Sequence, residues 1–121
     1  MQLVCPAGNL PALRAAIDAG ADAVYAGFRD QTNARAFPGL NFNEDELRAG
    51  IAYTHARGRK LYLALNTYPD SARLAHWHAA VDKAAELACD AIIGAVPAAT
   101  LRFRWSSVGL SSLIVNAVKM V

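Results

Sequence analysis

Short apolar runs alternate along this chain with segments whose apolar positions repeat at helical spacing. Four runs have the length and composition of buried strands: residues 2–5, 22–26, 60–65 and 90–94. Three segments between them each have one apolar face, as amphipathic helices do: residues 9–19, 43–57 and 71–88. Two strands joined through a helix run parallel, and this crossover is right-handed in nearly all proteins. The pattern therefore predicts an α/β fold in which parallel strands alternate with helices.

The junction between helix and strand recurs three times. Residues 84–93 match residues 16–25 position for position, and residues 56–65 form a looser copy. In two of these copies Gly20 and Gly58 end the helix, because a glycine past the last turn accepts the left-handed conformation. Such repetition in a short chain supports the parallel α/β prediction.

Two asparagines are predicted to begin helices. Asn9 follows the turn after the first apolar run, and Asn43 opens a capping box that Glu46 completes. The acidic residues 44–46 also lie at the positive end of a helix dipole, so we assign them to helix stability. The third helix is expected to bury one stripe of side chains: Leu74, Trp77, Val81, Ala84 and Ala88.

The charge distribution divides the chain near its last quarter. All ten acidic residues lie at or before Asp90, whereas residues 97–121 carry three basic residues and no acidic ones. We therefore expect residues 1–96 to form the α/β unit and residues 97–121 to be a divergent apolar tail. Within that tail, residues 111–115 fit either a strand or an unstructured segment.

Composition gives no sign of secretion, membrane insertion or nucleic-acid binding. The N-terminus lacks a basic region before its apolar run. The apolar segment 105–121 is shorter than a membrane span of about 20 residues. The formal net charge of +2 is too small to indicate a nucleic-acid partner. We therefore expect a cytoplasmic protein without a transmembrane segment and without a nucleic-acid partner.

The predicted ligand site is the rim at which the strands end, because parallel α/β sheets bind ligands at the carboxyl ends of their strands. The longest irregular stretch, residues 27–43, mixes polar and aromatic side chains, as binding loops do. The alternative is a surface flap whose aromatic rings cover the end of the sheet. Arg29 and Arg35 carry the forked guanidinium that binds a carboxylate or a phosphate. The substrate-binding candidates on this rim are Asn9, Arg29, Asn33, Arg35, Asn41, Asn66 and Thr67.

This rim has no recognisable chemical centre. Cys5 would need a nearby histidine to act as a nucleophile, and the histidines all fall on predicted helices, where we interpret them as solvated: His55, His76 and His78. Cys5 and Cys89 are too few for a disulfide scaffold or an iron–sulfur site. They are also expected at opposite ends of their strands, about 15 Å apart. The sequence therefore assigns no catalytic residue and no metal ligand.

Several motifs resemble the start of the collagenase-like peptidase family, the thirty-second family of peptidases of unknown catalytic type. Residues 3–13 and the Gly-Ala-Asp-Ala-Val-Tyr stretch at 20–25 carry this resemblance. Residues 33–42 and the Ala-Leu-Asn-Thr stretch at 64–67 are similar to the UbiU-like members of the family. The resemblance covers roughly residues 1–93. It implies the N-terminal half of a TIM-like barrel, since a whole barrel needs about 250 residues.

The resemblance also implies a function. UbiU-like proteins serve oxygen-independent ubiquinone biosynthesis, in which they hydroxylate the quinone ring as a heterodimer with a UbiV-like protein. Each partner holds a [4Fe–4S] cluster on four cysteines that in the family lie beyond the end of this sequence, so no cofactor is expected in this chain. The chain departs from the family pattern at Ala88 and Cys89, where Gly-Ala is usual, and at Val96, where an aspartate is usual.

Two other functions fit the sequence: proteolysis, the historical label of the family, and a non-catalytic interaction module. Since no complete catalytic site is visible, whether the chain is an enzyme stays open here. We expect the chain alone to be inactive and prone to associate, because half a barrel leaves an unpaired edge at residues 3–5 or 90–94. The inner face of the sheet is expected to expose Val4, Val24, Leu63 and Ile92, or else the alternate side chains that point to the other face.

Overall fold

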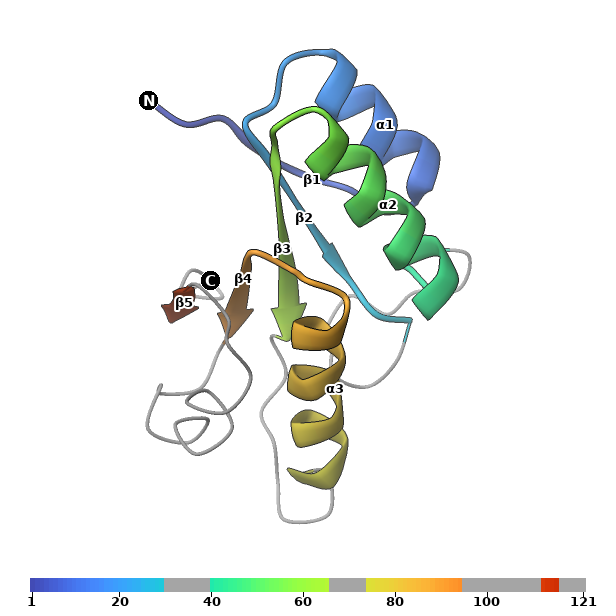
Figure 1. The fold of residues 1–121 in the computed structure, drawn as a ribbon, viewed down its shortest axis with the longest axis vertical. Helices are drawn as coiled ribbons and strands as arrows, with labels where there is room; N and C mark the ends of the chain where they lie inside the picture. The colour runs from blue at the N-terminus through green and yellow to red at the C-terminus, as the bar shows by residue number, and fades with distance from the viewer. Residues whose placement is uncertain (30–39, 66–73, 95–111, 116–121) are drawn as a thin grey trace.

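The computed structural model describes residues 1–29, 40–65, 74–94 and 112–115 (Figure 1). Within these ranges the chain forms five strands and three helices: β1 (Val4–Pro6), α1 (Leu10–Asp18), β2 (Ala23–Gly27), α2 (Glu44–Ala56), β3 (Lys60–Leu65), α3 (Leu74–Glu86), β4 (Ala91–Gly94) and β5 (Ser112–Val115). The predicted strands and helices are present, with described ends that differ by at most two residues. The predicted start of the third helix at residue 71 lies outside the described residues.

The strands form one sheet in the order β1-β2-β3-β4-β5, and all neighbouring pairs are parallel. The predicted α/β fold with alternating parallel strands and helices is therefore confirmed. Because each strand lies next to the preceding one, the sheet has the sequential order of a barrel wall, and it is compatible with part of a TIM-like barrel. Residues 112–115, which were compatible with either a strand or an unstructured segment, pair with β4 as a strand.

Helices cover one face of the sheet. Val24, Leu63 and Ile92 point to that face and are fully buried in a core that also contains Leu13 of α1 and Trp77 of α3. Figure 1 shows α1 and α2 side by side against the first strands and α3 beside the carboxyl end of β3. The amphipathic faces that the sequence predicted thus supply the main core of the unit.

The opposite sheet face carries a second apolar cluster of Ala23, Tyr62, Ala91 and Ile93. Each of these residues is at most 9% exposed. Tyr62 lies beside Ala91 in the register, so the large ring and the small methyl group pack together on this face. The expectation of exposed apolar side chains is therefore right for Val4, which is 36% exposed, and wrong for Val24, Leu63 and Ile92, which are fully buried in the helix-covered core.

The three helix-to-strand junctions share one backbone geometry. Gly20, Gly58 and Ala88 all have positive φ angles, of 102°, 67° and 64°. In each case the next residue donates a backbone hydrogen bond to the carbonyl five positions earlier, as in the Schellman motif. The predicted repeat is confirmed, but α3 ends at Glu86. Ala88 is therefore an exposed turn residue and not part of the buried stripe, because a left-handed residue cannot continue a helix.

Aspartates fasten the opening residues of the strands, at the end of the sheet opposite the predicted rim. Oδ2 of Asp22 accepts the Leu3 amide at 2.8 Å, and Oδ2 of Asp90 accepts the Leu61 amide at 2.8 Å. Asp90 also pairs with Nε2 of His55 at 2.8 Å. His55 is exposed, as predicted, and this pair additionally joins the end of α2 to the residue before β4.

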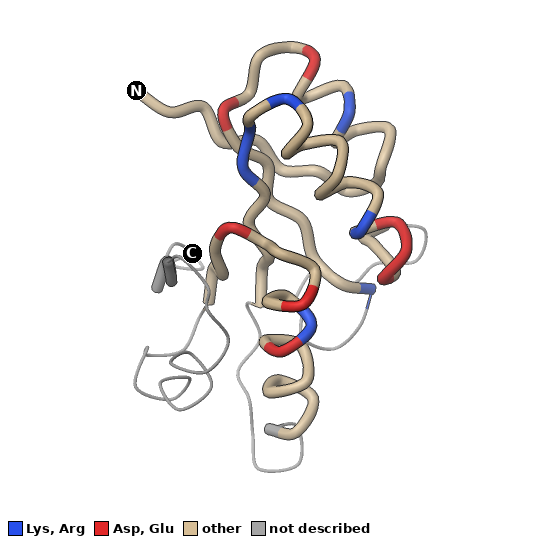
Figure 2. The backbone as a smooth tube through the Cα atoms, in the orientation of Figure 1, with Lys and Arg blue, Asp and Glu red and all other residues tan. Residues whose placement is uncertain are grey.

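Charged residues of opposite sign lie close together in the described part of the chain. Figure 2 shows the basic residues before β3 beside acidic residues of the α1–β2 turn. Arg57 pairs with Asp18 at 3.7 Å and Arg59 with Asp22 at 3.1 Å. None of the described helices has the length and apolar character that crossing a membrane would require.

Candidate functional site

The rim at the carboxyl ends of β1 and β2 is built by segments that are distant in sequence. The Asn41 amide donates to the Gly8 carbonyl at 2.6 Å, which ties the returning loop to the β1–α1 turn. Phe42 pairs with Phe28 in a parallel bridge, with its amide 3.1 Å from the Gly27 carbonyl. The short segment at residues 41–42 therefore extends the sheet at the end of β2.

Arg29 fastens this returning segment. Its Nη2 atom donates to the Asn41 carbonyl at 3.0 Å and to Oε1 of Glu46 at 3.3 Å, and its Nε atom donates to the Leu40 carbonyl at 3.3 Å. The side chain is 45% exposed. The sequence suggested that the Arg29 guanidinium could bind a carboxylate or phosphate ligand. In the structure it instead forms hydrogen bonds within the protein. Arg29 is at the predicted rim, but its contacts make it a clamp on the loop.

Asn41 occupies a backbone position that few residues accept. Its φ of 76° lies in the left-handed region, where asparagine is better tolerated than branched or bulky residues. The residue is 7% exposed, so the polar side chain is enclosed within the structure. The left-handed backbone at Asn41 therefore directs the chain toward the bridge between Phe42 and Phe28. This is a structural role, in addition to the predicted role in ligand binding.

Asn9 serves the helix that follows it. Its Oδ1 atom accepts the Ala12 amide at 2.8 Å, which makes it the N-cap of α1, as its position predicted. The substrate-binding role assigned to Asn9 therefore competes with a capping role for the same oxygen. Four other predicted site residues lie outside the described residues: Asn33, Arg35, Asn66 and Thr67.

The first turn of α2 links the rim to α3. Oδ1 of Asn43 accepts the Glu46 amide at 2.8 Å, which confirms Asn43 as the N-cap. The Glu46 side chain pairs with Arg29 and does not complete the predicted capping box in the described part of the chain. Glu44 pairs with Nζ of Lys83 at 3.2 Å and with Arg48 at 3.0 Å. The hydrogen bond from Lys83 is the main cause that lowers the pKa of Glu44, and the same contact raises the pKa of Lys83. These acids stabilise the helix end and its neighbour, as predicted.

The described residues contain no assembled catalytic group. Cys89 is buried, and burial, followed by the charge of Asp90, raises the pKa of its thiol to about 12. It is therefore a protonated thiol at neutral pH and a poor nucleophile. Cys5 is half-buried and free, without a hydrogen bond to a histidine in the described part of the chain. Two isolated cysteines do not fit a [4Fe–4S] cluster, which takes four thiolates.

Two side-chain contacts escaped the sequence analysis, one at the rim and one at the opposite end of the sheet. The Arg29 clamp joins residues 11 to 17 positions apart, and the His55–Asp90 pair joins residues 35 positions apart. Local periodicity carries no signal for such contacts. A weak signal existed for Asp90, since it matches Asp22 in the repeated junction, and both aspartates bind the amide of a neighbouring strand.

The family model for peptidase family U32 matches residues 8–105. A tRNA hydroxylation protein P of Helicobacter pylori is 39% identical over 97 residues, which are 80% of this chain and 23% of that protein. An uncharacterized protease of Methanocaldococcus jannaschii is 46% identical over 67 residues, which are 55% of this chain and 16% of that protein. A collagenase of Porphyromonas gingivalis is 33% identical over 100 residues, which are 83% of this chain and 24% of that protein. The chain thus spans less than a quarter of the length of these relatives.

Proposed function

Because this chain belongs to peptidase family U32, we propose that it is the N-terminal part of a UbiU-like subunit for oxygen-independent ubiquinone biosynthesis. In this proposal the complete protein hydroxylates the quinone ring together with a UbiV-like partner in the cytoplasm. The chain contributes the first strands of the barrel and part of its ligand rim. Alone it is expected to be inactive.

The observation that carries the proposal is the loop end held by Arg29. The segment whose motif is similar to UbiU-like members ends at Phe42, and Arg29 and Gly8 hold that end against the carboxyl edge of the sheet. Ligands of parallel α/β sheets bind at this edge. The described rim therefore supports a role in positioning a substrate, with the reacting groups supplied by the rest of the protein.

Proteolysis has less support from the described residues. A thiol protease needs a reactive thiolate beside a base. Cys89 is held as a thiol by burial, and Cys5 has no hydrogen bond to a histidine in the ranges that the structure describes. The collagenase among the relatives is the reason to test this activity. If the protein cleaves gelatin and Cys5→Ala abolishes the cleavage, proteolysis would be favoured over our proposal.

A tRNA substrate is the second candidate, because the Helicobacter pylori relative is named for tRNA hydroxylation. It shares with the first candidate a hydroxylation reaction. The net charge is small and most cations of the described residues are paired with carboxylates, so in this candidate the remainder of the protein would supply most phosphate contacts.

Deletion of the intact gene distinguishes these candidates. Anaerobic cultures of the deletion strain are analysed for ubiquinone and for hydroxylated nucleosides in digested tRNA, with the full-length gene restored as the control. Our proposal predicts loss of anaerobic ubiquinone with normal aerobic ubiquinone. Loss of hydroxylated nucleosides alone would favour the tRNA candidate, and unchanged levels of both would refute a role in hydroxylation.

A further inference from the structure

The large hydrophobic side chains that are exposed in the described ranges lie along the β1 edge of the sheet. Val4 begins the strand, and Leu3 and Met1 precede it. Leu40 lies beside Gly8, just past the end of the strand, where a Cβ atom on Gly8 would be 3.5 Å from the Cδ2 atom of Leu40. We propose that this edge binds a second copy of the chain, as an antiparallel strand pair centred on Val4.

The hydrogen bonds to β2 determine which backbone groups of β1 point outward. The Leu3 carbonyl accepts the Ala23 amide at 3.2 Å, and the Ala7 amide donates to the Tyr25 carbonyl at 2.9 Å. Successive residues of a strand direct their backbone groups to opposite sides, so the residues between these contacts face away from β2: Gln2, Val4 and Pro6. Outward backbone groups of an edge strand are a template for pairing with another chain.

Pro6 selects the register of this pairing. It has no backbone N–H, so a pair centred on Cys5, in which Pro6 faces Val4 of the second copy, would lose half of the hydrogen bonds at these positions. In a pair centred on Val4, the two Val4 residues exchange both N–H···O bonds, and each Gln2 amide meets a Pro6 carbonyl. This register also keeps all three strand residues, Val4–Pro6, within the contact.

The same arrangement covers the exposed apolar side chains. The two Val4 side chains meet on one face of the extended sheet, and Leu3 meets Cys5 of the second copy on the face that the helices cover. An antiparallel pair also brings the carboxyl end of β1 to the amino end of the other β1, so Leu40 comes near Met1 of the second copy. The edge is therefore complementary to itself, as a two-fold symmetric contact requires.

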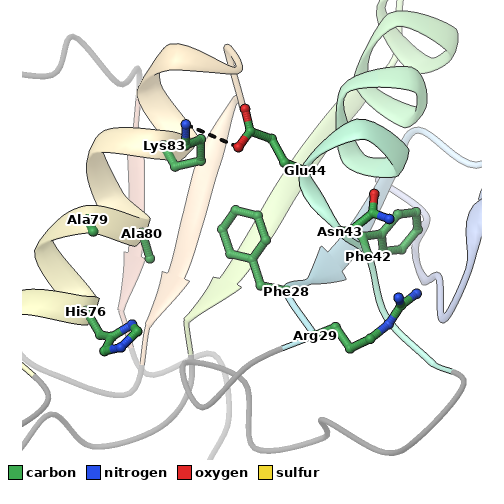
Figure 3. Close-up of a pocket in the computed structure, with 9 residues that line it drawn as sticks. All are labelled: Phe28, Arg29, Phe42, Asn43, Glu44, His76, Ala79, Ala80 and Lys83. Carbon is green, nitrogen blue, oxygen red and sulfur yellow. Dashed lines mark ion pairs between the residues drawn. The ribbon is translucent and has the colours of Figure 1, made fainter.

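The β1 edge also lacks charged side chains that would oppose this contact. Residues 1–13 contain none, and Figure 2 shows the tube in tan from the N-terminus to the start of α1. Charged side chains are a usual means by which proteins keep edge strands from pairing. On the helix side, charges instead pair within the chain, as the dashed line between Glu44 and Lys83 in Figure 3 marks.

Disulfide cross-linking of the purified 121-residue chain tests both the edge and the register, and it is independent of the proposed hydroxylation. Leu3→Cys places a thiol opposite Cys5 of the second copy, in a non-hydrogen-bonded pair whose Cα atoms are about 4.5 Å apart, within the reach of a disulfide. Leu3→Cys with Cys5→Ser removes the facing thiol and is the matched control. Cys89 is buried and is left unchanged. Covalent dimers are measured by non-reducing electrophoresis after mild oxidation.

We expect light scattering to show the unchanged chain passing from one copy to two as its concentration rises. Leu3→Cys should give about tenfold more covalent dimer than its control. Val4→Cys with Cys5→Ser should also cross-link, because the two Val4 residues face each other, and this variant serves if Leu3→Cys does not fold. A chain that stays monomeric overturns the proposal. Growth beyond two copies, which indicates β1 pairing with β5, or cross-linking of the control, which indicates another register, also overturns it.

Discussion

Arg29 shows how a residue chosen for its chemistry can act through its position. The sequence analysis selected it because a guanidinium at the strand rim suits an anionic ligand. The structure directs that guanidinium to the carbonyls of Leu40 and Asn41 and to Glu46. The residue therefore holds residues 40–42 beside the end of β2, which is a structural role.

Arg29→Ala should release this loop end. The contacts are half-exposed, so we expect the free energy of unfolding to fall by only about 1 kcal/mol. Hydrogen exchange at the Phe42 and Arg29 amides should become faster, because their bridge loses its support. Arg48→Ala, which removes a cation that pairs with Glu44 in the next turn of α2, is the matched control. Equal exchange rates in both variants would contradict the clamp.

Ala88 tests the left-handed turn. An L-residue with a side chain is strained there by about 1–2 kcal/mol, whereas glycine is not but loses more conformational entropy on folding. Ala88→Gly should therefore raise the free energy of unfolding by about 0.5 kcal/mol, and Gly20→Ala at the equivalent turn should lower it by about 1 kcal/mol. Urea denaturation measures both, and a destabilised Ala88→Gly variant would show that the turn is not strained.

Cys89 makes stability depend on pH in the alkaline range. Its folded-state pKa of about 12 lies above the unfolded value of about 8.5, so the unfolded chain loses the thiol proton first as pH rises. Stability from this group is complete below about pH 8.5 and falls between about pH 8.5 and 12, by up to about 1.4 kcal/mol per pH unit. Urea denaturation at pH 8 and pH 10.5 should show a smaller loss in Cys89→Ala. Equal losses in both proteins would exclude this effect.

At the level of the elements, the repeated junction explains why three helices end in the same way. The apolar periodicity and the glycines placed these junctions correctly along the chain. The tertiary structure adds the aspartates that precede β2 and β4, since Asp22 accepts the amide of Leu3, just before β1, and Asp90 accepts the amide of Leu61 in β3. A helix-to-strand junction is thereby fastened to the strand beside it.

Asp90→Ala removes two of these fastenings at once. The Leu61 amide loses its acceptor, and His55 loses its partner. A part-buried amide left without an acceptor is costly, so we expect the free energy of unfolding to fall by about 2 kcal/mol. Asp22→Ala should also destabilise the fold, through the Leu3 amide. Asp45→Ala, an exposed acid in the first turn of α2, provides the control and should change stability by less than about 1 kcal/mol. A loss no larger than that of the control would argue against strand fastening.

At the level of the whole molecule, β5 changes the edges of the sheet. It covers β4, so the edge expected at residues 90–94 is paired, and the edge strands of the described sheet are β1 and β5. Leu3 is 55% exposed and Val4 is 36% exposed along the β1 edge. Exposed apolar edge strands template pairing with other chains. Association of the chain is therefore expected to proceed through β1.

Size-exclusion chromatography with light scattering tests this expectation. The unchanged chain should show concentration-dependent association, and Val4→Lys should reduce it, because a charge on an edge strand opposes pairing. A chain that ends at residue 111 loses β5, exposes β4 and should associate more strongly. Val4→Lys samples that associate as strongly as the unchanged chain would place the contact elsewhere, and a monodisperse unchanged chain would exclude association altogether.

The sequence by itself determined the order and direction of the elements. Helical and strand periodicities, the glycine turns and the asparagine caps are local properties, and crossover helices force neighbouring strands to be parallel. It also indicated which sheet edge would carry a ligand rim. The tertiary structure alone decided how Arg29 and His55 are used, because the Arg29 clamp and the His55–Asp90 pair join residues far apart in the chain. Such contacts depend on the packing of whole elements, which leaves no periodic pattern in the sequence.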